Sequence, residues 1–237
     1  MSRKKKEMRN SRWDRETMFG KNMSFATAEA YKLLRTNVMF SFAENSCHIV
    51  GVTSAVSGEG KSLTACNLAY ALSELGKKVL LVDGDLRLPT VATKLGINQE
   101  PGVTNLLVSG GDYHSAIQKG AVDTRLDVLP AGAPSLHPTE LLSSEKMKEL
   151  MEDLSEEYDY IVVDLPPVTV VSDALVISGL LHGVVMVVRN GIVEEKTLAD
   201  AMRQIEMVKL RVLGFVYNGS SGVSKRNYGY YSGYDKK

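Results

Sequence analysis

The sequence predicts an α/β fold in which a mostly parallel central sheet is covered by helices on both faces. Short runs of β-branched and apolar residues alternate along the chain with longer segments of helical periodicity. The short runs are continuously apolar, which is typical of strands that are buried on both sides in a parallel sheet. With 237 residues, the chain has room for one domain with a full-sized core and short tails.

Residues 1–23 are predicted to form a basic, flexible N-terminal arm. Within the first fifteen residues, seven Lys and Arg side chains stand against only two acidic ones, Glu7 and Asp14. A solvated arm is the simplest interpretation. The alternative is contact with anionic lipid head groups, in which each basic residue contributes about 1 kcal/mol near the surface.

A helix is expected from 24 to 42, with Thr27 as its N-cap. Glu29, Lys32 and Arg35 follow one another at intervals of three on this helix. Such a row of charges is either a solvated face or a salt-bridging contact between subunits, and the pattern leaves both open. The apolar residues at helical spacing are Tyr31, Leu34, Val38 and Phe42.

The segment 48–63 predicts a phosphate-binding loop between a short strand and a helix. Gly58 and Gly60 allow the main chain to turn its N–H groups inward, and a helix starting near Lys61 presents its positive N-terminal end to the same place. The segment fits the P-loop pattern G-x-x-x-x-G-K-[ST] except at Ala55, where the first Gly is usual. A strand–turn–helix corner without a ligand is the alternative. The residues predicted to bind the nucleotide are Ser57, Gly58, Glu59, Gly60, Lys61, Ser62 and Leu63.

Three carboxylates follow two predicted strands, at 79–82 and 160–163. In a parallel sheet, Asp83, Asp85 and Asp164 emerge at the carboxyl edge beside the loop. Each alone is equally well explained as a turn residue or a helix cap. Together they suit phosphoryl transfer, which needs a metal on the phosphates, a positive group and a means of orienting the acceptor.

Each of these groups has an expected role at this edge of the sheet. The oxygens of Ser62, Asp83 and Asp164 are suited to Mg²⁺, a hard cation that takes few protein ligands. Lys61 is expected to reach the β- and γ-phosphates. Asp83 or Asp85 is expected to accept a hydrogen bond from the incoming hydroxyl. The predicted catalytic residues are therefore Lys61, Asp83 and Asp85, within a P-loop NTPase-like fold.

The remaining elements follow the same alternation of strands and helices. The helix after the loop is expected to stop at Gly76, a C-terminal cap position. Its apolar face comprises Leu68, Ala69, Leu72 and Leu75. Downstream, the pattern predicts strands at 127–129, 183–188 and 212–216, and helices at 140–154 and 196–209.

The folded domain is predicted to span 24–219, followed by a disordered tail at 220–237. The tail has almost no aliphatic residues and cannot bury a core. It nevertheless holds four of the ten tyrosines of the chain, so these aromatic residues are not explained by packing. The tail tyrosines are Tyr228, Tyr230, Tyr231 and Tyr234.

Composition narrows the range of functions. Lys plus Arg and Asp plus Glu both number 28, so global charge gives no argument for a nucleic-acid partner. Cys47 and Cys66 have no metal-type spacing, and a reduced cytosol is the simple expectation. The longest apolar runs, such as Val184–Val188, are far shorter than a membrane span, so membrane association is expected to need a partner or a charged tail.

Three motifs and the tyrosine-rich tail resemble the bacterial tyrosine kinases of capsular and exopolysaccharide synthesis. Residues 52–62, 80–87 and 160–167 are similar to that family's Walker A, A′ and B motifs, the second containing Asp-x-Asp-x-Arg. Residues 29–37 resemble its N-terminal oligomerisation helix. The likeness covers nearly the whole chain, and it departs from the usual pattern at Ser57, Leu165 and Lys32.

The resemblance implies an ATP- and Mg²⁺-dependent protein-tyrosine kinase that regulates polysaccharide synthesis and export. It implies a homo-oligomeric ring, with Glu29, Lys32 and Arg35 at the subunit contact, in which the tail tyrosines are phosphorylated in trans. In firmicutes the family's kinase is a separate cytoplasmic chain, activated by a transmembrane adaptor that recruits it to the inner face of the plasma membrane. Other protein substrates and a cognate phosphatase are expected; nucleic acid is not.

Two other functions compete with the kinase. A partitioning-type P-loop ATPase works as an ATP-driven positional switch, but it carries a second lysine where this chain has Val56, and it has no use for the tail. A scaffold that binds ATP without turnover differs from the kinase only in activity. Phosphorylation of the tail by purified protein separates these alternatives.

Overall fold

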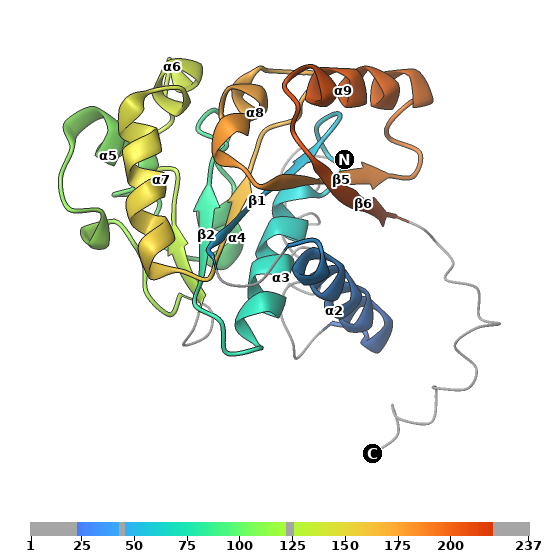
Figure 1. The fold of residues 1–237 in the computed structure, drawn as a ribbon, viewed down its shortest axis with the longest axis horizontal. Helices are drawn as coiled ribbons and strands as arrows, with labels where there is room; N and C mark the ends of the chain where they lie inside the picture. Colours follow the sequence, from blue (N-terminus) through green and yellow to red (C-terminus); the bar gives the residue numbers. More distant parts are fainter. Residues whose placement is uncertain (1–22, 43–45, 122–125, 220–237) are drawn as a thin grey trace, which may run out of the picture.

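The computed structural model describes residues 23–42, 46–121 and 126–219 (Figure 1). The predicted basic arm, apart from Met23, and the predicted tyrosine tail lie outside the described residues. No helix in the described part of the chain is long and apolar enough to cross a membrane.

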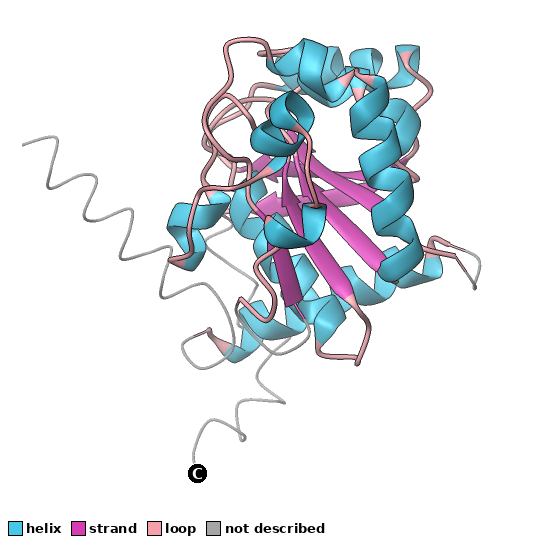
Figure 2. Cartoon of the chain, turned by 90° about the vertical axis from the view of Figure 1, so that its left-hand side faces the viewer, coloured by secondary structure: helices cyan, strands magenta, loops and turns pink. Residues whose placement is uncertain are grey.

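The centre of the molecule is a sheet flanked by helices (Figure 2). The sheet has six strands in the order β3-β2-β4-β1-β5-β6, with every neighbouring pair parallel. The strands are β1 (His48–Ser54), β2 (Val79–Asp83), β3 (Leu126–Leu129), β4 (Tyr160–Asp164), β5 (Gly183–Arg189) and β6 (Val212–Asn218). Strands β1, β2 and β4 are buried along their whole length, as expected for continuously apolar strands. The predicted parallel sheet is therefore confirmed.

Helices cover both faces of the sheet and divide the interior into two apolar cores. One face carries α2 (Phe25–Phe40), α3 (Lys61–Ser73) and α4 (Val91–Leu95). The other carries α5 (Val103–Ser109), α6 (Pro138–Leu142), α7 (Glu145–Glu157), α8 (Asp173–Val176) and α9 (Glu195–Met207), with single 3₁₀ turns η2 (Tyr113–Ser115) and η3 (Ser178–Leu180). Because neighbouring residues of a strand point to opposite faces, Ile49 belongs to one core and Val50 to the other.

One predicted helix cap and one predicted continuous helix were wrong, in both cases because a nearby serine makes the cap. Helix α2 is capped by Ser24, whose Oγ accepts a hydrogen bond from the N–H of Thr27 at 3.2 Å, so Thr27 already lies in the first turn. The single helix predicted at 140–154 is two helices, α6 and α7. Ser144 interrupts it and caps α7 by accepting from the N–H of Met147 at 3.3 Å.

The predicted end of α3 was also too late. The helix ends at Ser73, and Leu75, which was expected on its buried face, is exposed. Gly76 adopts a φ of 80° and turns the chain towards β2, so the glycine acts three residues after the end of the helix.

Candidate active site

The phosphate loop joins β1 to α3 at the carboxyl edge of the sheet. Gly58 and Gly60 have φ values of 87° and 96°, in the left-handed region that favours glycine. At Gly60, a Cβ would also lie only 2.7 Å from Nδ2 of Asn218. Helix α3 begins at Lys61, directly after this turn, so its unpaired N–H groups and positive dipole end face the loop. The cradle therefore fits a polyphosphate.

Glu59 braces the loop from inside. Its buried carboxylate accepts hydrogen bonds from the N–H of Val56 at 2.8 Å and from the N–H of Arg189 at 3.1 Å. The Glu59 side chain, predicted to bind the nucleotide, is thus committed to the shape of the loop, and only its main-chain N–H remains for a ligand. Its carbonyl accepts from Nδ2 of Asn218 at 2.9 Å, and the Arg189 guanidinium donates to the carbonyl of Gly58 at 3.2 Å.

The structure brings Lys61 together with the carboxylates at the ends of β2 and β4. Nζ of Lys61 lies 2.9 Å from Oδ2 of Asp85 and 3.5 Å from Oδ1 of Asp164, and it donates to Oγ of Ser62 at 3.3 Å. Asp83 is the register partner of Asp164 across the two strands. Burial by itself would lower the pKa of the Lys61 amine, but Asp164 and Asp85 outweigh burial and raise it. The site therefore holds a charged lysine at the helix N-terminus.

Asp83 is buried at the end of β2. Its two oxygens accept hydrogen bonds from the N–H groups of Asp85 and Val91 at 3.2 and 3.1 Å. Burial and the neighbouring charge of Asp164 nevertheless raise the pKa of Asp83 to about 8. Burial also raises the pKa of Asp164. Burial and the nearby charge of Asp164 therefore both favour the protonated form of Asp83.

The donor set fits Mg²⁺ held jointly with phosphates. Oδ2 of Asp164 is buried and has no hydrogen-bond partner among the described residues, and the Ser62 hydroxyl lies beside the same carboxylate. In the described part of the chain, no group of three or more His, Cys, Asp and Glu side chains encloses a metal by itself. Magnesium characteristically uses one or two carboxylates and completes its shell with phosphate oxygens and water.

The structure adds a second charged cluster that sequence reasoning missed. Arg87 is paired with Asp173, the first residue of α8, and with Thr139 of α6.

The missed residues around the phosphate loop, Arg189 and Asn218, are the last residues of β5 and β6. The rule that singled out Asp83 and Asp164, polar residues where parallel strands end, would also have found these two.

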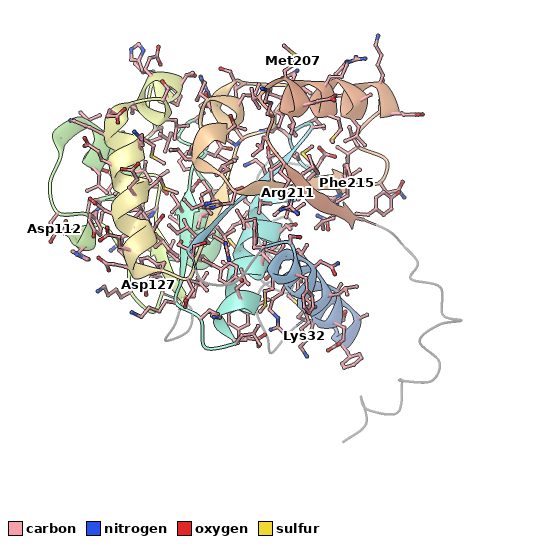
Figure 3. All side chains as sticks on the ribbon, in the orientation of Figure 1. Lys32, Asp112, Asp127, Met207, Arg211 and Phe215 are labelled. Carbon is pink, nitrogen blue, oxygen red and sulfur yellow. The ribbon has the colours of Figure 1, made fainter. Side chains whose placement is uncertain are left out.

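The charged residues of α2 do not share one environment. Lys32 pairs with Glu29 at 2.8 Å on the exposed side of the helix (Figure 3). The Arg35 side chain is only 14% exposed and turns towards α3, where it donates to the carbonyl of Ala71 at 2.8 Å and lies 3.6 Å from Glu74. The tail tyrosines lie outside the described residues, so their predicted phosphorylation stays a prediction.

Comparisons with known proteins show which families and folds the chain resembles. The family described as AAA domain matches residues 47–212. The tyrosine-protein kinase YwqD of Bacillus subtilis strain 168 is 37% identical over 223 residues, which are 94% of each chain. The kinase domain of the Escherichia coli tyrosine kinase ETK matches with a TM-score of 0.77 at 29% identity, covering 81% of this chain and 75% of that one.

A similar fold also occurs outside the tyrosine kinases. The septum site-determining protein MinD of Pyrococcus horikoshii, complexed with Mg-ADP, matches with a TM-score of 0.61 at 25% identity, over 72% of this chain and 70% of that one. The predicted P-loop NTPase-like α/β fold is thereby confirmed. Among these matches, the tyrosine kinases cover more of the chain and share more of its sequence.

Proposed function

Because the chain belongs to the bacterial tyrosine-protein kinases of capsule and exopolysaccharide synthesis, we propose that its phosphate loop and strand-end carboxylates transfer the γ-phosphate of ATP to tyrosine hydroxyls. One observation carries this assignment to particular residues. The Lys61 amine is held between carboxylates from two strand ends, at 2.9 Å from Asp85 and 3.5 Å from Asp164, directly at the N-terminus of α3.

In the proposed mechanism, this chain supplies positioning and charge. The N–H groups of the loop and of the first turn of α3 bind the phosphates, and Lys61 offsets the charge that develops on the transferred group. Asp83 or Asp85 accepts a hydrogen bond from the tyrosine hydroxyl and orients its oxygen. Ser62, Asp83 and Asp164 would hold Mg²⁺, which would supply positive charge to offset that of the phosphates.

The proposed acceptors include the tail tyrosines of a neighbouring subunit in a ring. A short chain of eighteen residues follows Gly219, and tethering such a segment raises its effective concentration to about millimolar. We further propose a transmembrane adaptor as activator and membrane recruiter, other tyrosine-bearing proteins as substrates and a cognate phosphatase as the opposing enzyme. Nucleic acid has no part in this function.

Mass spectrometry of purified full-length protein tests the proposal. After incubation with ATP and Mg²⁺, phosphate is expected on the tail tyrosines of the wild type and on none of them in Lys61→Met. Mixing Lys61→Met protein with wild type carrying Phe at all four tail positions should phosphorylate the Lys61→Met tails, which only transfer between subunits allows. ATP turnover without any phosphotyrosine would instead favour the partitioning-type ATPase.

A further inference from the structure

We infer that Arg87 is a positioning residue: through Asp173 and Thr139, it fixes the segment that holds Asp85 against Lys61. This inference rests on the proposed function, because it concerns the geometry of the same site. Arg87 follows Asp85 by two residues, while Asp173 lies beyond the end of β4 and Thr139 lies in α6. The cluster therefore ties together three segments that are far apart along the chain.

The contacts of the cluster form a closed triangle. The Arg87 guanidinium donates from Nε to Oδ2 of Asp173 at 2.7 Å and from Nη2 to Oδ1 at 3.0 Å. Nη2 also donates to Oγ1 of Thr139 at 3.0 Å, and the Thr139 hydroxyl donates to Oδ1 of Asp173 at 2.7 Å. A bidentate arginine–carboxylate pair fixes orientation as well as distance. Oδ1 of Asp173 thus accepts hydrogen bonds from both Arg87 and Thr139, which fixes the carboxylate further.

Burial of Asp173 makes the cluster sensitive to the loss of Arg87. Asp173 is fully buried, so its charge depends on Arg87 for compensation, whereas the Arg87 side chain is 38% exposed. Removing one partner of a buried pair leaves an uncompensated charge and disturbs the surrounding structure. Two of the three guanidinium nitrogens bind Asp173 and Thr139. In this arrangement, Arg87 therefore stabilises the structure of the site and is not positioned primarily to bind a phosphate.

The hydrogen bonds around Asp85 carry the position of Arg87 to the catalytic lysine. The N–H of Leu88 donates to Oδ1 of Asp85 at 3.1 Å, which leaves Oδ2 to face Lys61. The carbonyl of Leu86 accepts from the N–H of Ser135 at 3.0 Å. Arg87 lies between these two main-chain contacts, and its side chain is anchored to Asp173 and Thr139. In the inferred role, loss of this anchor loosens the segment and weakens the bond from Leu88 to Asp85.

Kinetics with a separate acceptor peptide, residues 219–237, test this role in the full-length protein. If a displacement near 1 Å costs about 100-fold in rate, Arg87→Gln should lower kcat for peptide phosphorylation by roughly 10- to 100-fold. The Kd for ATP should change by less than about threefold, as expected when an interaction acts only in the transition state. Thr139→Val, which keeps the ion pair, should lower kcat by about 3- to 10-fold, on the scale of one lost hydrogen bond.

The double variant Arg87→Gln, Asp173→Asn separates positioning from phosphate binding. Replacing both charges by amides removes the unpaired buried carboxylate, so kcat should recover at least about fivefold over Arg87→Gln alone, a coupling expected of residues in contact. Arg203→Gln is the matched control, because Arg203 pairs with Asp200 on the exposed side of α9 and should leave kcat unchanged. A raised KM for ATP with normal kcat, or no recovery in the double variant, would overturn the inference.

An NMR readout distinguishes failure of this inference from failure of the proposed function. If the wild type forms no phosphotyrosine, the kinase proposal fails, but the side-chain signal of Lys61, assigned with Lys61→Met, still reports its contact with Asp85. That signal should shift in Thr139→Val and in Arg87→Gln and stay in place in Arg203→Gln. An unmoved Lys61 signal in folded Thr139→Val rejects the positioning role even if Arg87→Gln fails to fold.

Discussion

Asn218, the last residue of β6, donates a hydrogen bond from Nδ2 to the main-chain carbonyl of Glu59 in the phosphate loop at 2.9 Å. The last residue of β6 therefore also supports the turn that precedes α3. Gly219 and the predicted tail follow directly, so the attachment point of the tail adjoins the proposed nucleotide site.

Asn218→Ala should weaken ATP binding without abolishing the fold. The substitution removes the donor for the Glu59 carbonyl, and the loss of one such bond, about 1 kcal/mol, corresponds to roughly fivefold in Kd. Calorimetric titration with ATP and Mg²⁺ measures the change. Asn98→Ala, at an exposed position, is the control and should bind like wild type. Equal affinities for all three proteins would show that the brace does not shape the loop.

The charges at the sheet edge should be required together for transfer. Lys61→Met, Asp83→Asn and Asp164→Asn should each reduce phosphotyrosine formation by about 100-fold or more, the scale for removing a preorganised charged group. Rates are compared in purified protein whose folding has been checked by circular dichroism. Lys148→Met, which removes an exposed lysine paired with Glu145 on α7, should keep the wild-type rate. Wild-type rates in all three site variants contradict the assigned roles.

Stability without nucleotide and Mg²⁺ should fall as the pH rises from 6 to 9. The folded pKa of Asp83, about 8, lies above its ordinary value of about 3.9, so the folded state retains a proton that the unfolded state has lost. The free energy of unfolding should therefore fall by at most about 1.4 kcal/mol per pH unit, and the fall should level off above the folded pKa.

Denaturant unfolding of wild type and Asp83→Asn at several pH values measures this effect. The amide cannot accept both N–H groups that Asp83 accepts, which costs stability equally at every pH. The informative quantity is therefore how the free energy of unfolding changes with pH. As the pH rises, it should fall in the wild type more than in Asp83→Asn. Parallel curves would mean that Asp83 is already ionised at pH 6.

The charged residues of α2 should divide into two classes. Glu29→Ala and Lys32→Ala should weaken a salt-sensitive assembly and leave the melting temperature unchanged, because exposed pairs contribute only about 0–1 kcal/mol. Arg35→Ala should also lower the free energy of unfolding by about 1 kcal/mol, since it removes the donor for the Ala71 carbonyl. Light scattering of unphosphorylated protein with Mg²⁺, together with thermal melts, tests both. A monomer at every concentration and salt level argues against the subunit contact.

Phosphorylation of the tail should dissociate the assembly. Each phosphate adds about −1.5 to −2 charges, so several on one tail overwhelm its few lysines and arginines and make neighbouring tails repel. Replacing all four tail tyrosines by Phe should keep the ring intact in ATP while ATP binding stays unchanged. Light scattering before and after addition of ATP follows this. If the four-Phe protein disassembles in ATP as readily as the wild type, phosphorylation of the tail does not control assembly.

Much of the fold and part of the site follow from sequence because they depend on local patterns. Continuous apolar runs predicted strands buried on both faces, and the glycines of the loop predicted a turn of the main chain at the phosphate site. Since parallel strands end at one edge, Asp83 and Asp164 could be placed at the same edge of the sheet from the sequence. Helix ends were harder to predict, because more than one hydroxyl residue can cap the same turn, as Ser24 and Thr27 show at α2.

Tertiary structure decided which distant groups complete the site. Arg87 and Asp173 are 86 residues apart, and Glu59 and Arg189 are 130 apart, so no periodicity links them. Arg35, which the sequence placed in a row of charges on α2, is separated from that row because α3 packs beside its helix. The physical reason is that spacing along a chain determines the direction of a side chain within its own element, whereas its partner depends on which elements pack together and at what register.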